Sequence, residues 1–315
     1  MSTWRKPLLA ALPLCCAVAI AACGSSKSSS SSASTSSSSA PASTSTSASS
    51  SSGGSANSAV VALVPSALKS KGTLTVAADA SYAPDEFIGS DGHTVVGMDA
   101  DLAKALAAEM GLKANVVNAT FATIIPGLAA GRYDMGASSF SDTLAREKTV
   151  DFVDYAHVGE SFYTKGTGGV SIGSIADICG KTVSVESGTT EQADAKTQSA
   201  KCTKAGKPAV NVLVFNTQTE ANLAVSSGRA QLGFADTPVA LYQVKQSGGE
   251  FKIVGAAYAT GPYGLAIPKN GLDKAVLAAL QDLVKNGTYK SILAKWGLSG
   301  IAIPASQVKI NGATS

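Results

Sequence analysis

Between residues 72 and 296, short apolar runs typical of buried strands alternate with stretches whose apolar residues recur at helical spacing. This alternation constrains the fold more than any other feature, because it is typical of α/β proteins with mainly parallel sheets. The clearest helix is expected from a cap at Asp99 to Gly111, with Leu102 and Leu106 on one face. The other expected elements are strands at 72–78, 113–117, 135–138, 181–185, 210–215 and 232–235, and helices at 121–130, 190–198, 219–227, 272–286 and 289–296.

A glycine-rich break at 166–169 interrupts this pattern, which starts again at residue 181. We therefore expect a second unit of structure to begin near the break. Residues 60–315 are numerous enough to form two lobes of about 100 to 150 residues each.

The first 22 residues have the pattern of a signal peptide. Arg5 and Lys6 precede an apolar run, 8–22, that is too short to span a membrane. The sequence IAACG at 20–24 resembles the lipobox of bacterial lipoproteins, in which the cysteine carries a diacylglyceryl group. We expect cleavage after residue 22 and lipidation of Cys23. The alternative is an ordinary signal peptide with a chance cysteine.

Residues 23–59 are expected to form a disordered tether after the lipidated cysteine. Nearly all are Ser, Ala, Thr or Gly, and Lys27 is the one charged residue. Such a segment cannot bury enough apolar surface to offset its loss of conformational entropy. The whole chain carries 25 Lys and Arg against 22 Asp and Glu, a net charge of +3. This balance gives no basis for binding nucleic acid.

Only two of the five cysteines, Cys179 and Cys202, remain after the signal peptide and the lipidation site are set aside. In an exported protein such a pair is expected to form a disulfide, which would stabilise the fold by about 3 kcal/mol. The two histidines, His93 and His157, do not lie at ligand spacing from these cysteines. We therefore expect neither a metal site nor a cofactor.

Three stretches carry a family resemblance: DASYAP at 79–84, SSFSDTLAREKTVDF at 138–152 and GRAQLGFAD at 228–236. In this order and spacing they resemble the polar amino acid group of extracellular solute-binding proteins, family 3. These proteins are the soluble receptors of ABC importers. The resemblance extends over nearly all of residues 72–297.

The resemblance implies a two-lobed, periplasmic-binding-protein-like fold of type II. Each lobe would be a mainly parallel sheet flanked by helices, with the ligand between the lobes. Lobe 1 would comprise 60–160 and 262–315, and lobe 2 would comprise 161–261. Two crossover hinge segments would lie near 161–165 and 259–263.

The resemblance also assigns the groups that would hold an amino acid's charges. Arg146 would bind the α-carboxylate, because a guanidinium makes two parallel charge-assisted bonds to a carboxylate. Asp236 would receive the α-ammonium. Ser139, Ser141 and Thr190 would supply hydroxyl, carbonyl and N–H groups. The alternatives are an ion pair between Arg146 and Asp151 or another acid of the same lobe, and a helix N-cap role for Asp236.

For the ligand's side chain, Tyr82 and Phe121 match the two walls of the family's pocket, and Asp79 matches the acid at its far end. This arrangement favours a long polar or cationic side chain. Glutamine-binding members can also carry an acid here, and both aromatic residues could instead be core residues. Asp85 and Glu86 stand where the family usually has an aromatic residue directly after Pro84. They could line the pocket or be solvated.

The expected function is that of a monomeric receptor, anchored by lipid at the extracytoplasmic face of the cell membrane. It would capture a polar amino acid, with a mild preference for a basic one, and deliver it to an ABC transporter permease. We expect binding rather than catalysis. The alternative is an enzyme on the same fold resembling cyclohexadienyl dehydratase, with Glu186 or Glu191 as its catalytic acid.

Overall fold

The computed structural model describes residues 56–314. The predicted signal peptide, the lipidation of Cys23 and most of the predicted tether lie outside the described residues. Within 56–314, no helix combines the length and the apolar character that a membrane crossing requires.

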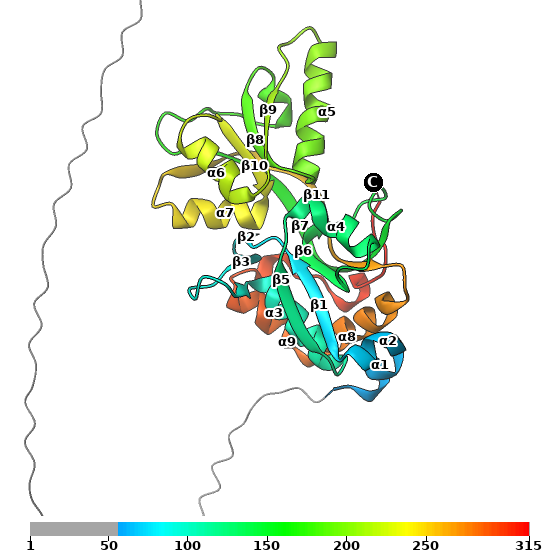
Figure 1. Cartoon of the computed structure of the whole chain (residues 1–315). Helices are drawn as coiled ribbons and strands as arrows, with labels where there is room; N and C mark the ends of the chain where they lie inside the picture. The colour runs from blue at the N-terminus through cyan, green and yellow to red at the C-terminus, as the bar shows by residue number, and fades with distance from the viewer. Residues whose placement is uncertain (1–55, 315) are drawn as a thin grey trace, which may run out of the picture. The chain divides into compact units, whose positions relative to one another are not determined.

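Eight strands form one sheet in the order β5-β1-β6-β11-β7-β10-β8-β9 (Figure 1). β1 pairs in parallel with β5 and β6, and β8 pairs in parallel with β9 and β10. The expected α/β fold with mainly parallel groups of strands is therefore confirmed. The strands are β1 Thr73–Ala78, β5 Lys113–Asn118, β6 Met135–Ser141, β7 Val150–Lys165, β8 Thr182–Glu186, β9 Asn211–Phe215, β10 Leu232–Asp236 and β11 Phe251–Pro268.

Two long strands, β7 and β11, connect the two parallel groups (Figure 1). They span 16 and 18 residues and pair with each other in antiparallel fashion. Their register is irregular on both sides of Tyr258, next to Ala259, whose φ is 40°. We call the strands β1, β5 and β6 with their helices the β1 half, and β8, β9 and β10 with their helices the β8 half. The lobe limits expected from the sequence stay predictions.

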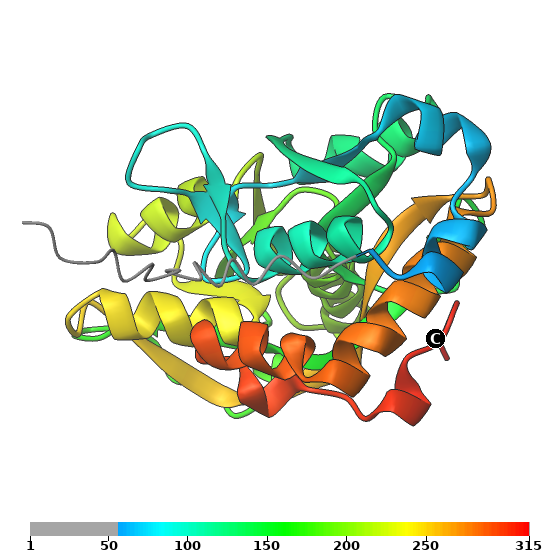
Figure 2. The same ribbon diagram turned by 90° about the horizontal axis from the view of Figure 1, so that it is seen from below.

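Helices flank both groups of strands, and a small sheet of β2, β3 and β4 lies beside the β1 half. Figure 2 shows α1 (blue) against α8 (orange), a contact that brings the first described residues to the last long helix. The β1 half carries α1 Ser58–Leu63, α2 Ser66–Lys71, α3 Met98–Glu109, α4 Phe121–Ala129, α8 Leu272–Asn286, α9 Thr288–Lys295, β2 Ser81–Tyr82, β3 Glu86–Ile88, β4 Val95–Val96, η2 Ser299–Ile301 and η3 Ala305–Gln307; the β8 half carries η1 Ile175–Ile178, α5 Thr190–Lys204, α6 Gln218–Ser226 and α7 Thr237–Gln246.

Two local expectations were wrong. Asp99 does not cap α3: Gly97 occupies the cap position, and Asp99 lies buried in the first turn. α1 begins at Ser58, one residue before the expected end of the tether. Its Val60 is buried in the main core, which explains why this short segment is folded.

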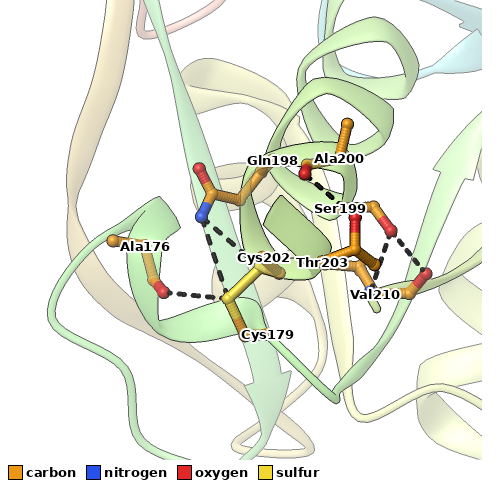
Figure 3. The surroundings of a disulfide bond; sticks show 8 residues. All are labelled: Ala176, Cys179, Gln198, Ser199, Ala200, Cys202, Thr203 and Val210. Atoms are coloured by element: carbon orange, nitrogen blue, oxygen red, sulfur yellow. Dashed lines mark hydrogen bonds between the residues drawn. A yellow bond between two sulfur atoms is a disulfide. The ribbon is translucent and has the colours of Figure 1, made fainter. Parts of the chain in front are cut away.

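A disulfide joins Cys179, directly after η1, to Cys202 in the last turns of α5 (Figure 3). The expected pairing is thus confirmed. Cys202 is buried with Ile178 and Val183 in the β8 half, and Nε2 of Gln198 lies 3.6 Å from its sulfur. The disulfide therefore ties α5 to the core around Cys202 in the β8 half. This core contains fewer buried residues than the main core of the β1 half.

Candidate functional site

All eight side chains predicted to contact the ligand line one small cavity. Both halves contribute, because parallel strands place the residues at their carboxyl ends on one edge of the sheet. Asp79 follows β1, Ser141 ends β6 and Asp236 ends β10. The lining residues are Asp79, Tyr82, Phe121, Ser139, Ser141, Arg146, Glu186, Thr189, Thr190, Glu191 and Asp236.

Arg146 lies in the turn after β6 and reaches across to the β8 half. Its Nη1 donates to the carbonyl oxygen of Ser141 at 2.7 Å, and its Nη2 donates to that of Gly188 at 2.9 Å. Its guanidinium also lies over the Phe121 ring, 5.4 Å from the ring centroid. Burial lowers the pKa of Arg146, while Glu191 and Asp236 oppose this shift. The alternative ion pair is wrong, because Asp151 pairs with Lys269 at 2.7 Å.

Asp236 occupies the cap position of α7, but its side chain makes no capping hydrogen bond. Instead, the hydroxyl of Tyr82 donates to its Oδ2 at 2.9 Å, and the N–H of Asp236 donates back to that hydroxyl oxygen at 3.1 Å. Burial raises the pKa of Asp236 to about 6, while the hydroxyls of Tyr263 and Tyr82 and the charge of Arg146 oppose the shift. The carboxylate is therefore charged at neutral pH.

Tyr82 is more than the flat wall expected from the sequence, since its hydroxyl joins the two halves through Asp236. The neighbouring Ser81 makes a second link, because its hydroxyl accepts the N–H of Gln218 at 3.0 Å. A third lies between the hydroxyls of Ser141 and Thr190, 3.3 Å apart. The described arrangement of the two halves is thus a closed one around the cavity.

The carboxylate of Asp79 is held in one orientation by three donors. Oδ1 accepts the N–H and the hydroxyl of Ser81 at 3.2 and 2.7 Å, and Oδ2 accepts the N–H of Phe121 at 2.8 Å. Phe121 begins α4, so its N–H is one of those that the helix leaves without an internal partner. A carboxylate fixed in this way is preorganised to bind a cation.

The N-terminus of α5 also faces the cavity. Thr189 caps this 15-residue helix through its hydroxyl, which accepts the N–H of Gln192 at 3.2 Å. Thr190 and Glu191 form the first turn and line the cavity. The positive end of a helix dipole, together with free N–H groups, favours a bound carboxylate.

Ser139, one of the lining residues, adopts a left-handed backbone conformation with a φ of 49° and is supported from the side away from the cavity. Its N–H donates to Asp99 at 2.7 Å and its hydroxyl donates to Asp85 at 2.9 Å, while the hydroxyl of Ser138 donates to Glu86 at 2.8 Å. Asp85 and Glu86 have no exposed surface and do not line the cavity. Neither role that the sequence left open for them is correct, since they support Ser138 and Ser139 from behind.

Sequence reasoning did not assign Glu186, Thr189 and Glu191 to a ligand site. Glu186 ends β8, as Asp236 ends β10, so its position relative to the strand was the signal that could have identified it. Burial, followed by neighbouring acids, raises the pKa of both Glu186 and Glu191. The cavity therefore brings four acidic side chains together with one guanidinium.

Two α/β halves joined by two long strands, with a polar cavity at the carboxyl ends of both groups of parallel strands, define a two-lobed, periplasmic-binding-protein-like molecule. Residues 74–299 match the model of bacterial extracellular solute-binding proteins, family 3, and the chain belongs to this family.

Similar proteins fall in the same class. The chain is 35% identical to the arginine-binding protein ArgT of Corynebacterium glutamicum over 241 residues, which cover 76% of this chain and 79% of that protein. It is 36% identical to an ancestral arginine-binding protein solved with arginine bound, with a TM-score of 0.66 over 71% of this chain and 98% of that one.

A third relative bears on the enzyme alternative. It is the ancestral amino acid-binding protein AncCDT-1, described as a precursor of cyclohexadienyl dehydratase, with 34% identity and a TM-score of 0.66. The similarity covers 73% of this chain and 97% of that one. All three of these relatives are described as binding proteins.

Proposed function

We propose that this protein is an extracytoplasmic receptor that captures a basic amino acid, arginine above all, and delivers it to an ABC importer. The observation that carries the proposal is the composition of the cavity, in which one guanidinium faces four acidic groups. Arginine carries one negative and two positive charges, so its charges complement such a site. The arginine-binding relatives support the same ligand.

Each end of the ligand would have its own partner. Arg146 uses two donors on Ser141 and Gly188, and a guanidinium has five, so it can also bind the α-carboxylate. The N-terminus of α5 at Thr190 would share that carboxylate. Asp236 would receive the α-ammonium, Tyr82 and Phe121 would flank the side chain, and Asp79 would bind its cationic end.

Binding would be coupled to transport through closure of the two lobes. A ligand held by Arg146 and Asp79 from one half and by Thr190 and Asp236 from the other makes its full set of contacts only when they are closed. It must therefore shift the population toward the closed form, which the permease would recognise. The predicted lobes, 60–160 with 262–315 and 161–261, would move about β7 and β11.

The protein would act as a monomer held at the membrane by the lipid on Cys23, with the Ser-rich tether giving it freedom of movement. The substitution Cys23→Ala should release it from the membrane fraction into the medium, as a Western blot of the two fractions would measure. Retention of the Cys23→Ala variant in the membrane fraction would contradict lipid anchoring.

The ligand site is tested by Arg146→Ala. In the wild type, arginine should raise Tm and bind by calorimetry. The variant should lose about 100-fold or more in affinity, because the α-carboxylate loses its charged side-chain partner. Arg229→Ala is the matched control, since Arg229 also lies over an aromatic ring, Phe215 at 5.3 Å, but does not line the cavity. Undiminished affinity in the Arg146→Ala variant, or a wild type that binds no amino acid, would overturn the proposal.

A further inference from the structure

Two carboxylic acids approach the cavity from opposite halves of the molecule. Asp79 directly follows β1 and Glu186 ends β8, so each lies at the carboxyl end of a parallel strand. Both line the cavity. Burial, and next the negative charge of Asp79, raise the pKa of Glu186. Because both groups line one cavity, a single bound cation can contact them both.

The carboxyl groups of Asp79 and Glu186 differ in how many hydrogen bonds the protein donates to them. The two oxygens of Asp79 accept three hydrogen bonds from Ser81 and Phe121. Glu186 is only 1% exposed, and among residues 56–314 no group donates to its Oε1. A buried carboxyl oxygen without a partner is costly and rare in native structures, so it calls for a partner that the protein itself does not supply.

The surroundings of Glu186 indicate the charge of that partner. The charged groups that act most strongly on it are Asp79, Asp236 and Glu220, and all three are acids. The hydroxyl of Tyr163 in β7 accepts a hydrogen bond from Gln218 at 3.0 Å and donates to Asn222, so its proton is already engaged. A cation placed between Asp79 and Glu186 would offset this accumulation of negative charge, whereas a neutral group would not.

We propose that Glu186 is a specificity-determining residue that forms, together with Asp79, a two-carboxylate clamp for the cationic end of the ligand's side chain. The inference rests on the proposed function and specifies which residues of that site recognise the side chain. A guanidinium suits the clamp because its five donors point outward in a plane, so that two carboxylates can bind different edges. Because the two acids come from different halves, the side-chain charge would itself favour closure.

The test compares arginine with citrulline, which has nearly the same shape but a neutral urea group in place of the guanidinium. In the Glu186→Gln variant, calorimetry should show affinity for arginine falling about 30-fold or more and affinity for citrulline changing less than about threefold. Gln keeps the size of Glu and removes its negative charge, while one acceptor oxygen becomes an amide donor. The control is Glu250→Gln, an exposed acid of the same half, which should leave both affinities unchanged.

A second variant separates charge from folding effects. Glu186→Asp keeps the carboxylate and should retain more of the preference for arginine than Glu186→Gln does, whatever the change in Tm of the ligand-free protein. Equal discrimination in wild type and Glu186→Gln would overturn the clamp while leaving the proposed function intact, since the wild type would still bind arginine. A wild type that binds neither compound nor any other amino acid would overturn both.

Discussion

Two groups of buried acids lie on either side of Ser139, and they differ in what they face. The cavity acids, Asp79, Glu186, Glu191 and Asp236, share a cavity with Arg146. The backing acids, Asp85, Glu86 and Asp99, have no exposed surface and converge on Ser138 and Ser139 from the other side. None of the ion pairs within residues 56–314 involves a backing acid.

The contrast shows that the partner, rather than the residue type, decides the role of a buried carboxyl group. Burial, and then the charge of Asp99, raise the pKa values of Asp85 and Glu86 well above their usual range, so folding favours their protonated forms. Protonated carboxyl groups can donate as well as accept hydrogen bonds, which suits a fixed support for the strained backbone at Ser139. The cavity acids, by contrast, await partners from a ligand.

The largest expected effect is on the pH dependence of stability. An acid whose pKa is raised by folding stabilises the protein fully below its unfolded pKa, about 4, and this contribution is lost as the pH rises through the folded pKa. Folding raises the pKa of Asp99 to about 6, and it raises the pKa values of Asp85 and Glu86 well above their usual range. Each group that stays protonated only in the folded state lowers the free energy of unfolding by about 1.4 kcal/mol per pH unit.

Thermal unfolding of the ligand-free protein should therefore shift downward by roughly 5 °C or more between about pH 4 and about pH 6, the window that Asp99 sets. Differential scanning calorimetry in buffers of equal ionic strength measures this shift. A Tm that stays constant or rises over that range would show that the backing acids are ionised in the folded protein.

The next largest effect tests the cavity acids. Asp236→Asn should lower the affinity for arginine about 100-fold, because the α-ammonium loses its carboxylate partner in a buried site. In the wild type, affinity should fall as the pH drops below about 6, since Asp236 must lose its proton to pair with the ammonium. The Asn variant should lack this pH dependence.

Calorimetric titrations at several pH values measure both effects. Asp273→Asn is the matched control, because Asp273 also lies at the start of a helix, α8, but does not line the cavity. An Asp236→Asn variant that binds arginine as tightly as the wild type would remove Asp236 from the site.

Periodicity was sufficient to predict most of the strands and helices, because local apolar patterns specify elements of this length. It did not predict the extent of β7 and β11, since their length arises from pairing with each other across both halves. It also missed β2 and β3, whose residues are held by tertiary contacts rather than by any local pattern.

The eight predicted site residues came from the resemblance, and the roles of the other buried acids did not. Asp85 and Glu86 were left as either pocket-lining or solvated, because only the tertiary structure reveals Ser138 and Ser139 beside them. Glu186 was considered only as a catalytic acid, because nothing local to β8 shows that Asp79 lies across from it.

The smallest expected effect comes from Glu86→Gln, the backing counterpart of Glu186→Gln. A Gln side chain can still accept from Ser138 and is uncharged, like the protonated form of Glu86 that burial favours. Affinity for arginine should change less than about threefold, because the hydrogen bond from Ser138 is kept. The decline of Tm with pH should become shallower, because one group that loses its proton on unfolding has been removed.

Calorimetric titration with arginine, and thermal unfolding at two pH values, measure the affinity and the Tm of both variants, Glu86→Gln and Glu186→Gln. If Glu86→Gln weakened arginine binding as much as Glu186→Gln, charge on Glu86 would be acting on the ligand, and the division into cavity and backing acids would fail.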